Sequence, residues 1–206
     1  MLYRKRNRTS VKDIGYSLYL YFLGLSYRNT AKALSKRFIK RSHVSIWKWV
    51  QHYRPEKIFY NRRKISEFIV DETQIKIGKD YFWIWVALES DNKTIVGIYI
   101  FLSRKKYVLV AEQFLQNIIK KYGRHPVSSD GGTWYISACK FLKLKHHINS
   151  SYEKSIIERI IQYIKDRTEN FDDYFPCNKN KCKLKHVVNW FHQFVDYYNK
   201  EVICLS

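Results

Sequence analysis

The stretch Glu67-Phe-Ile-Val-Asp71 begins the part of the chain that decides the fold. Three apolar residues in it lead into a single carboxylate. Residues 67–77, 81–90 and 94–103 are rich in β-branched and aromatic side chains, and short polar turns separate them. This pattern predicts a meander of three antiparallel strands. The second segment is apolar on both faces and is therefore expected inside the sheet.

The residues after this meander alternate helical with extended patterns. Apolar side chains that recur every three to four residues predict helices, whereas short apolar runs predict strands. Together they indicate an α/β fold with a mixed five-stranded sheet covered by helices. Helices are expected at 108–122, 133–142, 152–168 and 186–200, and strands at 126–130 and 145–148.

The residues before the meander predict a small all-helical head. A short basic arm precedes helices expected at 11–24, 27–37 and 42–53. In the second helix, Ala31, Leu34 and Phe38 are expected to face the interior of the head. This is a helix-turn-helix arrangement, and its third helix could enter a major groove of DNA.

The positive charge of the chain is concentrated in the head. The net charge is +20, and residues 1–64 hold 17 Lys and Arg against two acidic residues, so they carry +15 of it. A basic head on a nearly balanced body indicates a polyanionic partner such as nucleic acid. We expect a DNA-binding domain at 1–60 and a catalytic domain at 65–206.

Other sequence features indicate a cytoplasmic, nucleoid-associated protein. The most apolar stretch, residues 14–25, is shorter than the roughly 20 residues that a membrane span needs. No secretory signal is evident, and four irregularly spaced cysteines do not predict a disulfide framework. We therefore expect no membrane association and a reducing compartment.

Three carboxylates predict a metal site. Asp71 and Asp130 each end a predicted strand, and Glu158 lies on a predicted helix. Adjacent strands would place the two aspartates side by side, and the helix would deliver the glutamate. Two Mg²⁺ or Mn²⁺ ions about 3.5–4 Å apart can activate and neutralise the oxygens of a phosphodiester during displacement. Taken alone, each acid also has an ordinary explanation as a turn former, a strand end or a solvated helix charge.

The helical periodicity selects Glu158 as the third acid. Four isoleucines between 157 and 164 follow the i, i+3, i+4, i+7 pattern of a buried stripe. At about 100° per residue, Glu158 falls just outside this stripe. Glu153 is the alternative third ligand, although we expect it to project toward the apolar stripe.

Ordered motifs along nearly the whole chain resemble a known family. Val70-Asp-Glu-Thr73, Ser129-Asp-Gly-Gly132 and Ile157-Glu-Arg159, with the basic residues that follow, resemble the catalytic motifs of DDE-superfamily transposases. The match is to the sixth family of bacterial and archaeal insertion sequences. Residues 25–34 and 42–50 resemble that family's helix-turn-helix. The spacing of 28 positions from Asp130 to Glu158 is shorter than is usual for the family.

This resemblance implies a ribonuclease H-like core and metal-dependent cleavage and strand transfer at the ends of an insertion sequence. It also implies a replicative route, double-stranded DNA partners (terminal inverted repeats and target DNA), and a homodimer or larger synaptic assembly. Two alternatives stay open at this point. One is a catalytically inactive or repurposed DNA-binding protein, and the other is a ribonuclease H-like nuclease or resolvase.

Basic and polar side chains near these motifs are candidates for DNA contacts, because phosphate contacts position a protein on the duplex. The candidates are Arg28, Lys36, Arg37, Lys40, Arg41, His43, Ser45, Lys48, Lys154, Arg159 and Lys165.

A zinc site is a further candidate, with the ligands Cys177, Cys182, His186 and His192. The spacing of these residues departs from the common pattern, and the alternative is a surface loop with reduced cysteines.

Overall fold

The computed structural model describes residues 9–53, 65–77, 80–101, 108–168 and 184–205. The chain divides into two compact units, Met1–Pro55 and Glu56–Ser206, and each is considered separately. Among the described residues, no helix is both long and apolar enough to cross a membrane.

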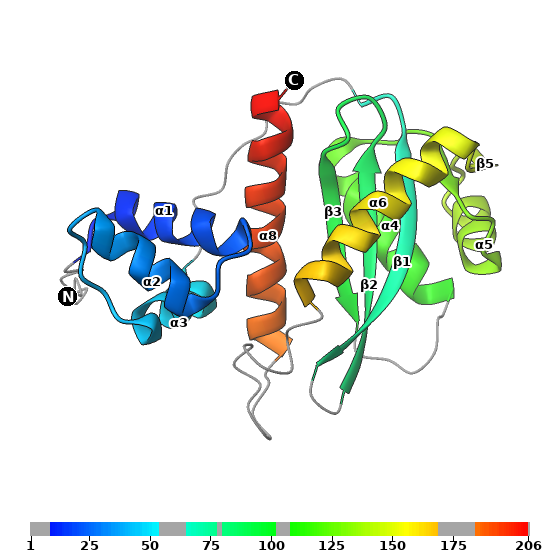
Figure 1. Ribbon diagram of the computed structural model, residues 1–206. Helices are drawn as coiled ribbons and strands as arrows, with labels where there is room; N and C mark the ends of the chain where they lie inside the picture. Colours follow the sequence, from blue (N-terminus) through cyan, green and yellow to red (C-terminus); the bar gives the residue numbers. More distant parts are fainter. Residues whose placement is uncertain (1–8, 54–64, 78–79, 102–107, 169–183, 206) are drawn as a thin grey trace, which may run out of the picture. The chain divides into compact units, whose positions relative to one another are not determined.

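The first unit consists of three helices, α1 (Val11–Phe22), α2 (Tyr27–Lys36) and α3 (His43–His52) (Figure 1). Each helix begins after a serine whose side chain accepts a hydrogen bond from the backbone N–H three residues later. Such caps satisfy amide groups that have no partner inside the helix. The three helices contact one another around apolar side chains that are almost fully buried: Ile14, Phe22, Leu34, Ile46 and Val50.

The expectation that Phe38 faces inward is wrong. Leu34 is fully buried, but the Phe38 side chain is 96% exposed. The helix ends at Lys36, and Phe38 adopts a left-handed conformation with φ of 62°. The N–H of Phe38 then bonds to the carbonyl of Ser35, and the N–H of Ile39 bonds to that of Leu34. This is the Schellman termination of a helix, and it turns Phe38 outward.

The second unit contains a five-stranded sheet with the order β3-β2-β1-β4-β5. The first three strands form an antiparallel meander, whereas β4 and β5 run parallel to β1. β2 therefore lies inside the sheet, as expected, and β1 is its middle strand. The strands are β1 (Phe68–Ile77), β2 (Asp80–Glu89), β3 (Ile95–Phe101), β4 (Val127–Ser129) and β5 (His146–Ile148).

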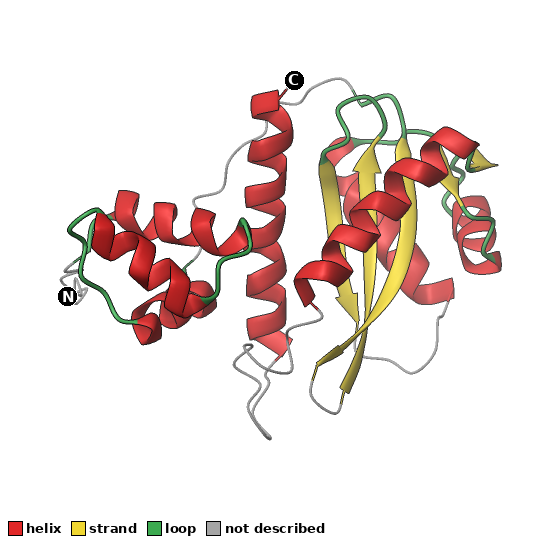
Figure 2. Cartoon of the chain, in the orientation of Figure 1, coloured by secondary structure: helices red, strands yellow, loops and turns green. Residues whose placement is uncertain are grey.

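Helices cover both faces of this sheet (Figure 2). On one face, α4 (Val108–Tyr122) and α5 (Thr133–Phe141) pack against a core that includes Phe68, Val70 and Trp85. On the other, α6 (Ser151–Thr168) contacts β1, and α8 (Leu184–Leu205) contacts β3. The side chain of Asn199 on α8 bonds to both backbone groups of Ile95, which anchors α8 to β3.

The alternation of side chains along β1 decides which residues meet α6. Phe68 and Val70 face α4 and α5, so Ile69 and Asp71 face the opposite side. The isoleucine stripe of α6, predicted from the sequence, is buried: Ile157, Ile160, Ile161 and Ile164. This mixed sheet with helices on both faces is the ribonuclease H-like fold, preceded by the small all-helical head, as the sequence predicts.

Candidate active site

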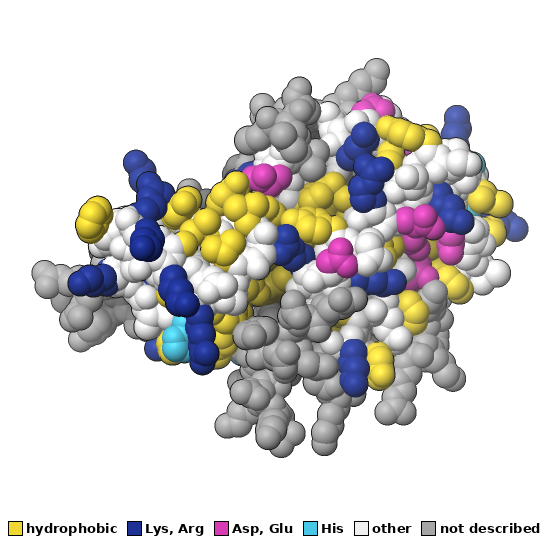
Figure 3. Space-filling view, viewed as in Figure 1, with side chains coloured by type: hydrophobic (Ala, Val, Ile, Leu, Met, Phe, Trp, Pro, Cys, Tyr) yellow, Lys and Arg dark blue, Asp and Glu magenta, His cyan; other side chains and the backbone are white. Residues whose placement is uncertain are grey.

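Two of the three predicted metal ligands line one cavity. Asp71 on β1 and Glu158 on α6 both border a cavity of about 980 Å³ on the α6 face of the sheet. Asp71 is half-buried, whereas the Glu158 side chain is 59% exposed. Figure 3 shows acidic side chains over this part of the molecule with Lys and Arg side chains around them. Further lining residues include Thr73, Ser155, Arg159, Gln162, Lys165 and Asp166.

The third predicted ligand, Asp130, directly follows β4 and is exposed. It is not among the residues that border this cavity. In the parallel pairing of β1 with β4, Phe68 lies beside Val127 and Ile69 beside Ser128. The same register, extended by two residues, places Asp130 beside Asp71. By the alternation of strands, both then belong to the face that α6 covers.

A tight turn holds Asp130 at the end of its strand. Its Oδ1 accepts a hydrogen bond from the N–H of Gly132 at 2.9 Å. Gly131 has a φ of +86°, which residues with a Cβ rarely adopt. At Gly132, a Cβ would come within 2.7 Å of the Trp134 ring. The Gly-Gly pair thus allows the chain to reverse and start α5 immediately after Asp130.

A buried hydroxyl lies near both aspartates. Tyr135 on α5 is fully buried, and burial raises the pKa of its hydroxyl well above the usual value. The neighbouring carboxylate of Glu72 raises this pKa further, as do Asp71 and Asp130. The carboxylates therefore approach one hydroxyl that stays protonated. The sequence analysis missed Glu72 and Tyr135, although an acid that follows Phe68 and Val70 on the same face of β1 was a visible signal.

The carboxylate of Glu158 on α6 makes a weak, exposed ion pair. Glu158 Oε1 lies 3.9 Å from Nζ of Lys154, one helical turn earlier, and both side chains are largely exposed. An exposed pair of this kind contributes about 0–1 kcal/mol, so reorienting Glu158 toward Asp71 has a low energetic cost. Arg159 and Lys165 border the same cavity as Asp71, whereas Lys154 does not.

Several known proteins are similar to this chain in sequence. No family model matches the chain. An uncharacterized protein of Methanocaldococcus jannaschii, MJ0017, is 32% identical over 197 residues, covering 95% of this chain and 89% of that protein. The transposase for insertion sequence element IS257 in transposon Tn4003 of Staphylococcus aureus is 26% identical, covering 90% and 84%. The transposase for the insertion sequence-like element IS431mec, also of S. aureus, is 26% identical, covering 79% and 75%.

Over most of its length the chain is similar to insertion-sequence transposases. Among solved structures, the catalytic core domain of BIV integrase superimposes with a TM-score of 0.43 and 15% identity, covering 65% of this chain and 83% of that chain.

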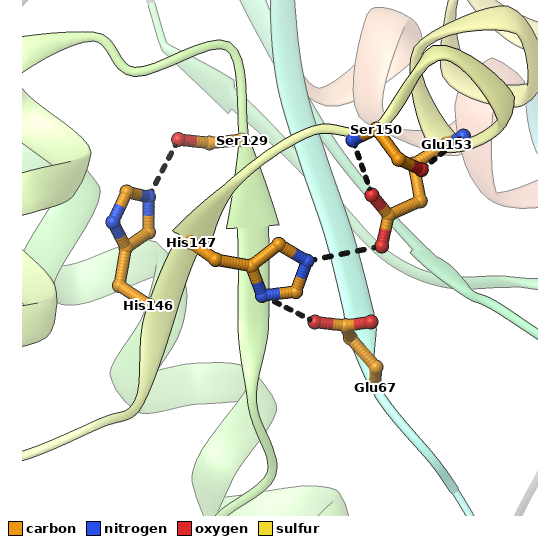
Figure 4. A network of polar contacts seen from close by, with 6 residues as sticks. All are labelled: Glu67, Ser129, His146, His147, Ser150 and Glu153. Carbon is orange, nitrogen blue, oxygen red and sulfur yellow. Dashed lines mark hydrogen bonds and ion pairs between the residues drawn. The ribbon is translucent and has the colours of Figure 1, made fainter.

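Glu153, the alternative third ligand, takes another position in this structure. The expectation that it projects toward the apolar stripe is wrong, because its carboxylate turns back to the start of α6 (Figure 4). Its Oε2 accepts the N–H of Ser150 at 2.6 Å, and its own N–H donates to the Ser150 hydroxyl at 3.3 Å. This reciprocal pair is a capping box. Burial would raise the pKa of Glu153, but its hydrogen bonds with Ser150 and its contact with His147 lower that pKa to about 2.

His147 joins Glu153 to a second glutamate. Its Nε2 lies 3.1 Å from Oε1 of Glu153, and its Nδ1 lies 3.2 Å from Oε1 of Glu67. Burial, opposed by His147 and reinforced by Glu153, raises the pKa of Glu67. These three side chains form a polar cluster separate from the residues that border the cavity.

The candidate DNA-contacting residues of the head are mostly on its surface. Arg37 stacks over the ring of Tyr16 at 4.4 Å, and Arg41 donates to the hydroxyl of Thr9 at 2.7 Å. Arg41 and Ser45 are half-buried. The remaining candidates in the head are exposed: Arg28, Lys36, Arg37, Lys40, His43 and Lys48.

The zinc site suggested by the sequence stays a prediction. Cys177 and Cys182 lie outside the described residues, and His186 and His192 belong to α8.

Replacing Gly131 with alanine should destabilise the second unit, because a side chain at φ of +86° costs about 1–2 kcal/mol. The free energy of unfolding, measured by urea denaturation, checks this. Gly15→Ala is the matched control: Gly15 lies in α1 with open space around it, and alanine there should stabilise the helix by about 0.5–1 kcal/mol. Equal stability of Gly131→Ala and the unsubstituted chain would contradict the left-handed turn after Asp130.

Proposed function

We propose that this chain is a DNA transposase in which Asp71, Asp130 and Glu158 bind two Mg²⁺ or Mn²⁺ ions and thereby cleave and join DNA at insertion-sequence ends. The main support is geometric. Asp71 and Glu158 border one cavity, and Asp130 follows the strand that pairs with the start of β1. The similarity of the chain to insertion-sequence transposases supports the same function.

The donor set fits the proposed ions. Three carboxylates supply the hard oxygen ligands that Mg²⁺ prefers, and the exposure of Asp130 and Glu158 leaves room for water and a DNA phosphate. When bound, such ions neutralise the attacking and leaving oxygens of a phosphodiester. Without a cation, carboxylates brought this close repel one another.

The basic residues beside the acids have a positioning role in this proposal. Arg159 and Lys165 border the same cavity as Asp71, and their side chains are exposed. Contacts from these cations to DNA phosphates would fix the register of the strand that is cut. Correct placement of the scissile phosphate is itself a large part of catalysis, because it removes the entropic cost of an encounter. Lys154 would bind phosphate after releasing Glu158.

The three-helix head is the proposed DNA-binding domain, spanning residues 1–60. In this proposal α3 enters the major groove of a terminal inverted repeat, with His43, Ser45 and Lys48 facing the DNA. The exposed cations of α2 and the following turn would contact the flanking phosphates. Because two ends and a target must be joined, a homodimer or a larger synaptic assembly acts on the nucleoid in the cytoplasm.

Replacing each proposed ligand should abolish cleavage while leaving DNA binding intact. Asp71→Asn, Asp130→Asn and Glu158→Gln each remove a charge that the ions need, so cleavage of end-containing DNA with Mn²⁺ should fall by about 10²–10³-fold or more. Gel electrophoresis of labelled DNA measures cutting and joining, and EDTA should stop both.

Two further variants make this experiment selective. Glu112→Gln on α4 lies on the opposite side of the sheet and should cleave normally. Glu153→Gln tests the alternative third ligand. If Glu158→Gln cleaves normally and Glu153→Gln does not, the assignment of the third ligand fails. Shifted but uncut DNA with the unsubstituted chain would instead favour an inactive DNA-binding protein.

The head should provide the salt-dependent part of DNA affinity. In the full chain, alanine at Lys36, Lys40 and Lys48 should weaken DNA binding. The plot of log K against log salt should also become less steep, by about 0.9 for each DNA phosphate that the variant no longer neutralises. Fluorescence anisotropy of an inverted-repeat duplex over a salt series measures this slope. Alanine at Lys120 and Lys121, exposed on α4, should leave it unchanged. If the α4 variant changed the slope and the head variant did not, the head would not be the DNA-binding domain.

A further inference from the structure

The polar cluster of Glu67, His147 and Glu153 joins three elements that are distant in the sequence. Glu67 directly precedes β1, His147 lies on β5, and Glu153 lies in the first turn of α6. Figure 4 shows the ring of His147 between the two carboxylates. Because β4 separates β1 from β5 in the sheet, this cluster bridges strands that do not pair.

The side chains of the cluster are close enough to hold a metal ion. One ligand atom from each of the three side chains can be chosen so that all three lie within 4.8 Å of one another. The two imidazole nitrogens lie 3.2 Å and 3.1 Å from the nearest carboxylate oxygens. To bind one ion at the roughly 2.0–2.2 Å that Zn²⁺ requires, one imidazole nitrogen and an oxygen of each glutamate would turn toward a common point.

The charges of the cluster favour a cation. The two carboxylates of the cluster lie close together. The side chains of Glu67 and Glu153 are 17% and 12% exposed, so both carboxylates are largely shielded from water. Oε1 of Glu67 is fully buried, and the polar contact that reaches it is the one with Nδ1 of His147 at 3.2 Å. A neutral imidazole has one N–H and can donate to only one carboxylate at a time. A divalent cation would neutralise both.

The ligand types favour a transition metal over magnesium. Imidazole nitrogen suits Zn²⁺ and related ions, whereas Mg²⁺ prefers oxygen alone. The side chain of His147 is 48% exposed, so water can reach the cluster and complete the coordination. The cluster therefore differs in chemistry from the carboxylate-only set of Asp71, Asp130 and Glu158.

We propose that Glu67, His147 and Glu153 bind one Zn²⁺ ion, which fastens the start of α6 to β1 and β5. The site has a structural role, because it fixes the end of the helix on which Glu158 lies two turns later. Zn²⁺ binding here does not depend on whether the chain cuts DNA.

Isothermal titration with ZnCl₂ tests this proposal on the full chain carrying Cys177→Ser and Cys182→Ser, which removes the competing thiols. Excess Mg²⁺ occupies carboxylate-only sites during the titration. At neutral pH, His147→Ala should lose one equivalent of Zn²⁺, and Glu67→Gln should bind that equivalent at least about tenfold more weakly. The melting temperature should rise with Zn²⁺ in the parent chain but not in His147→Ala, because a ligand stabilises the state that binds it.

Two control variants separate ligation from helix capping. His146→Ala removes the neighbouring imidazole, which bonds to Ser129 instead, and should keep the Zn²⁺ equivalent. Ser150→Ala removes the hydroxyl of the capping box but keeps all three ligands, so it should also bind. Circular dichroism establishes that each variant is folded. An unchanged Zn²⁺ stoichiometry in folded His147→Ala, or its loss in Ser150→Ala, would overturn the proposal.

Discussion

The parallel pairing of β4 with β1 is the constraint on which the candidate active site depends. Two residue pairs, Phe68 with Val127 and Ile69 with Ser128, place β4 beside the start of β1. Asp130 therefore leaves its strand next to Asp71 and on the same face. Because side chains alternate along a strand, a slip of one residue would move Asp130 to the face that α4 and α5 cover.

The position of Glu158 depends on packing at a second interface. The buried isoleucines of α6 fix the rotation of the helix against the sheet, and Glu158 emerges beside the stripe. The capping box of Ser150 and Glu153 fixes where the helix begins. Since α6 starts within three residues of the end of β5, the 28 positions between Asp130 and Glu158 are enough for α5, β5 and two turns of α6.

Local patterns in the sequence predicted most of the fold. The meander, the helices and the isoleucine stripe follow from the spacing of apolar side chains, which depends on residues close to one another in the chain. Phe38 was misplaced because helical periodicity does not indicate where a helix ends, and the Schellman turn reversed the direction of its side chain. The approach of Tyr135 to Glu72, and of His147 to Glu67, depends on contacts between distant segments, which no local pattern encodes.

The most direct test of this account is to locate the metal ions in crystals of the full chain grown with Mn²⁺. Anomalous scattering should show two Mn²⁺ ions about 3.5–4 Å apart, held by carboxylate oxygens of Asp71, Asp130 and Glu158. Such a result would require Glu158 to turn from Lys154 toward Asp71. Mn²⁺ bound without Asp130, or with Glu153 in the place of Glu158, would contradict the proposed convergence of these three carboxylates.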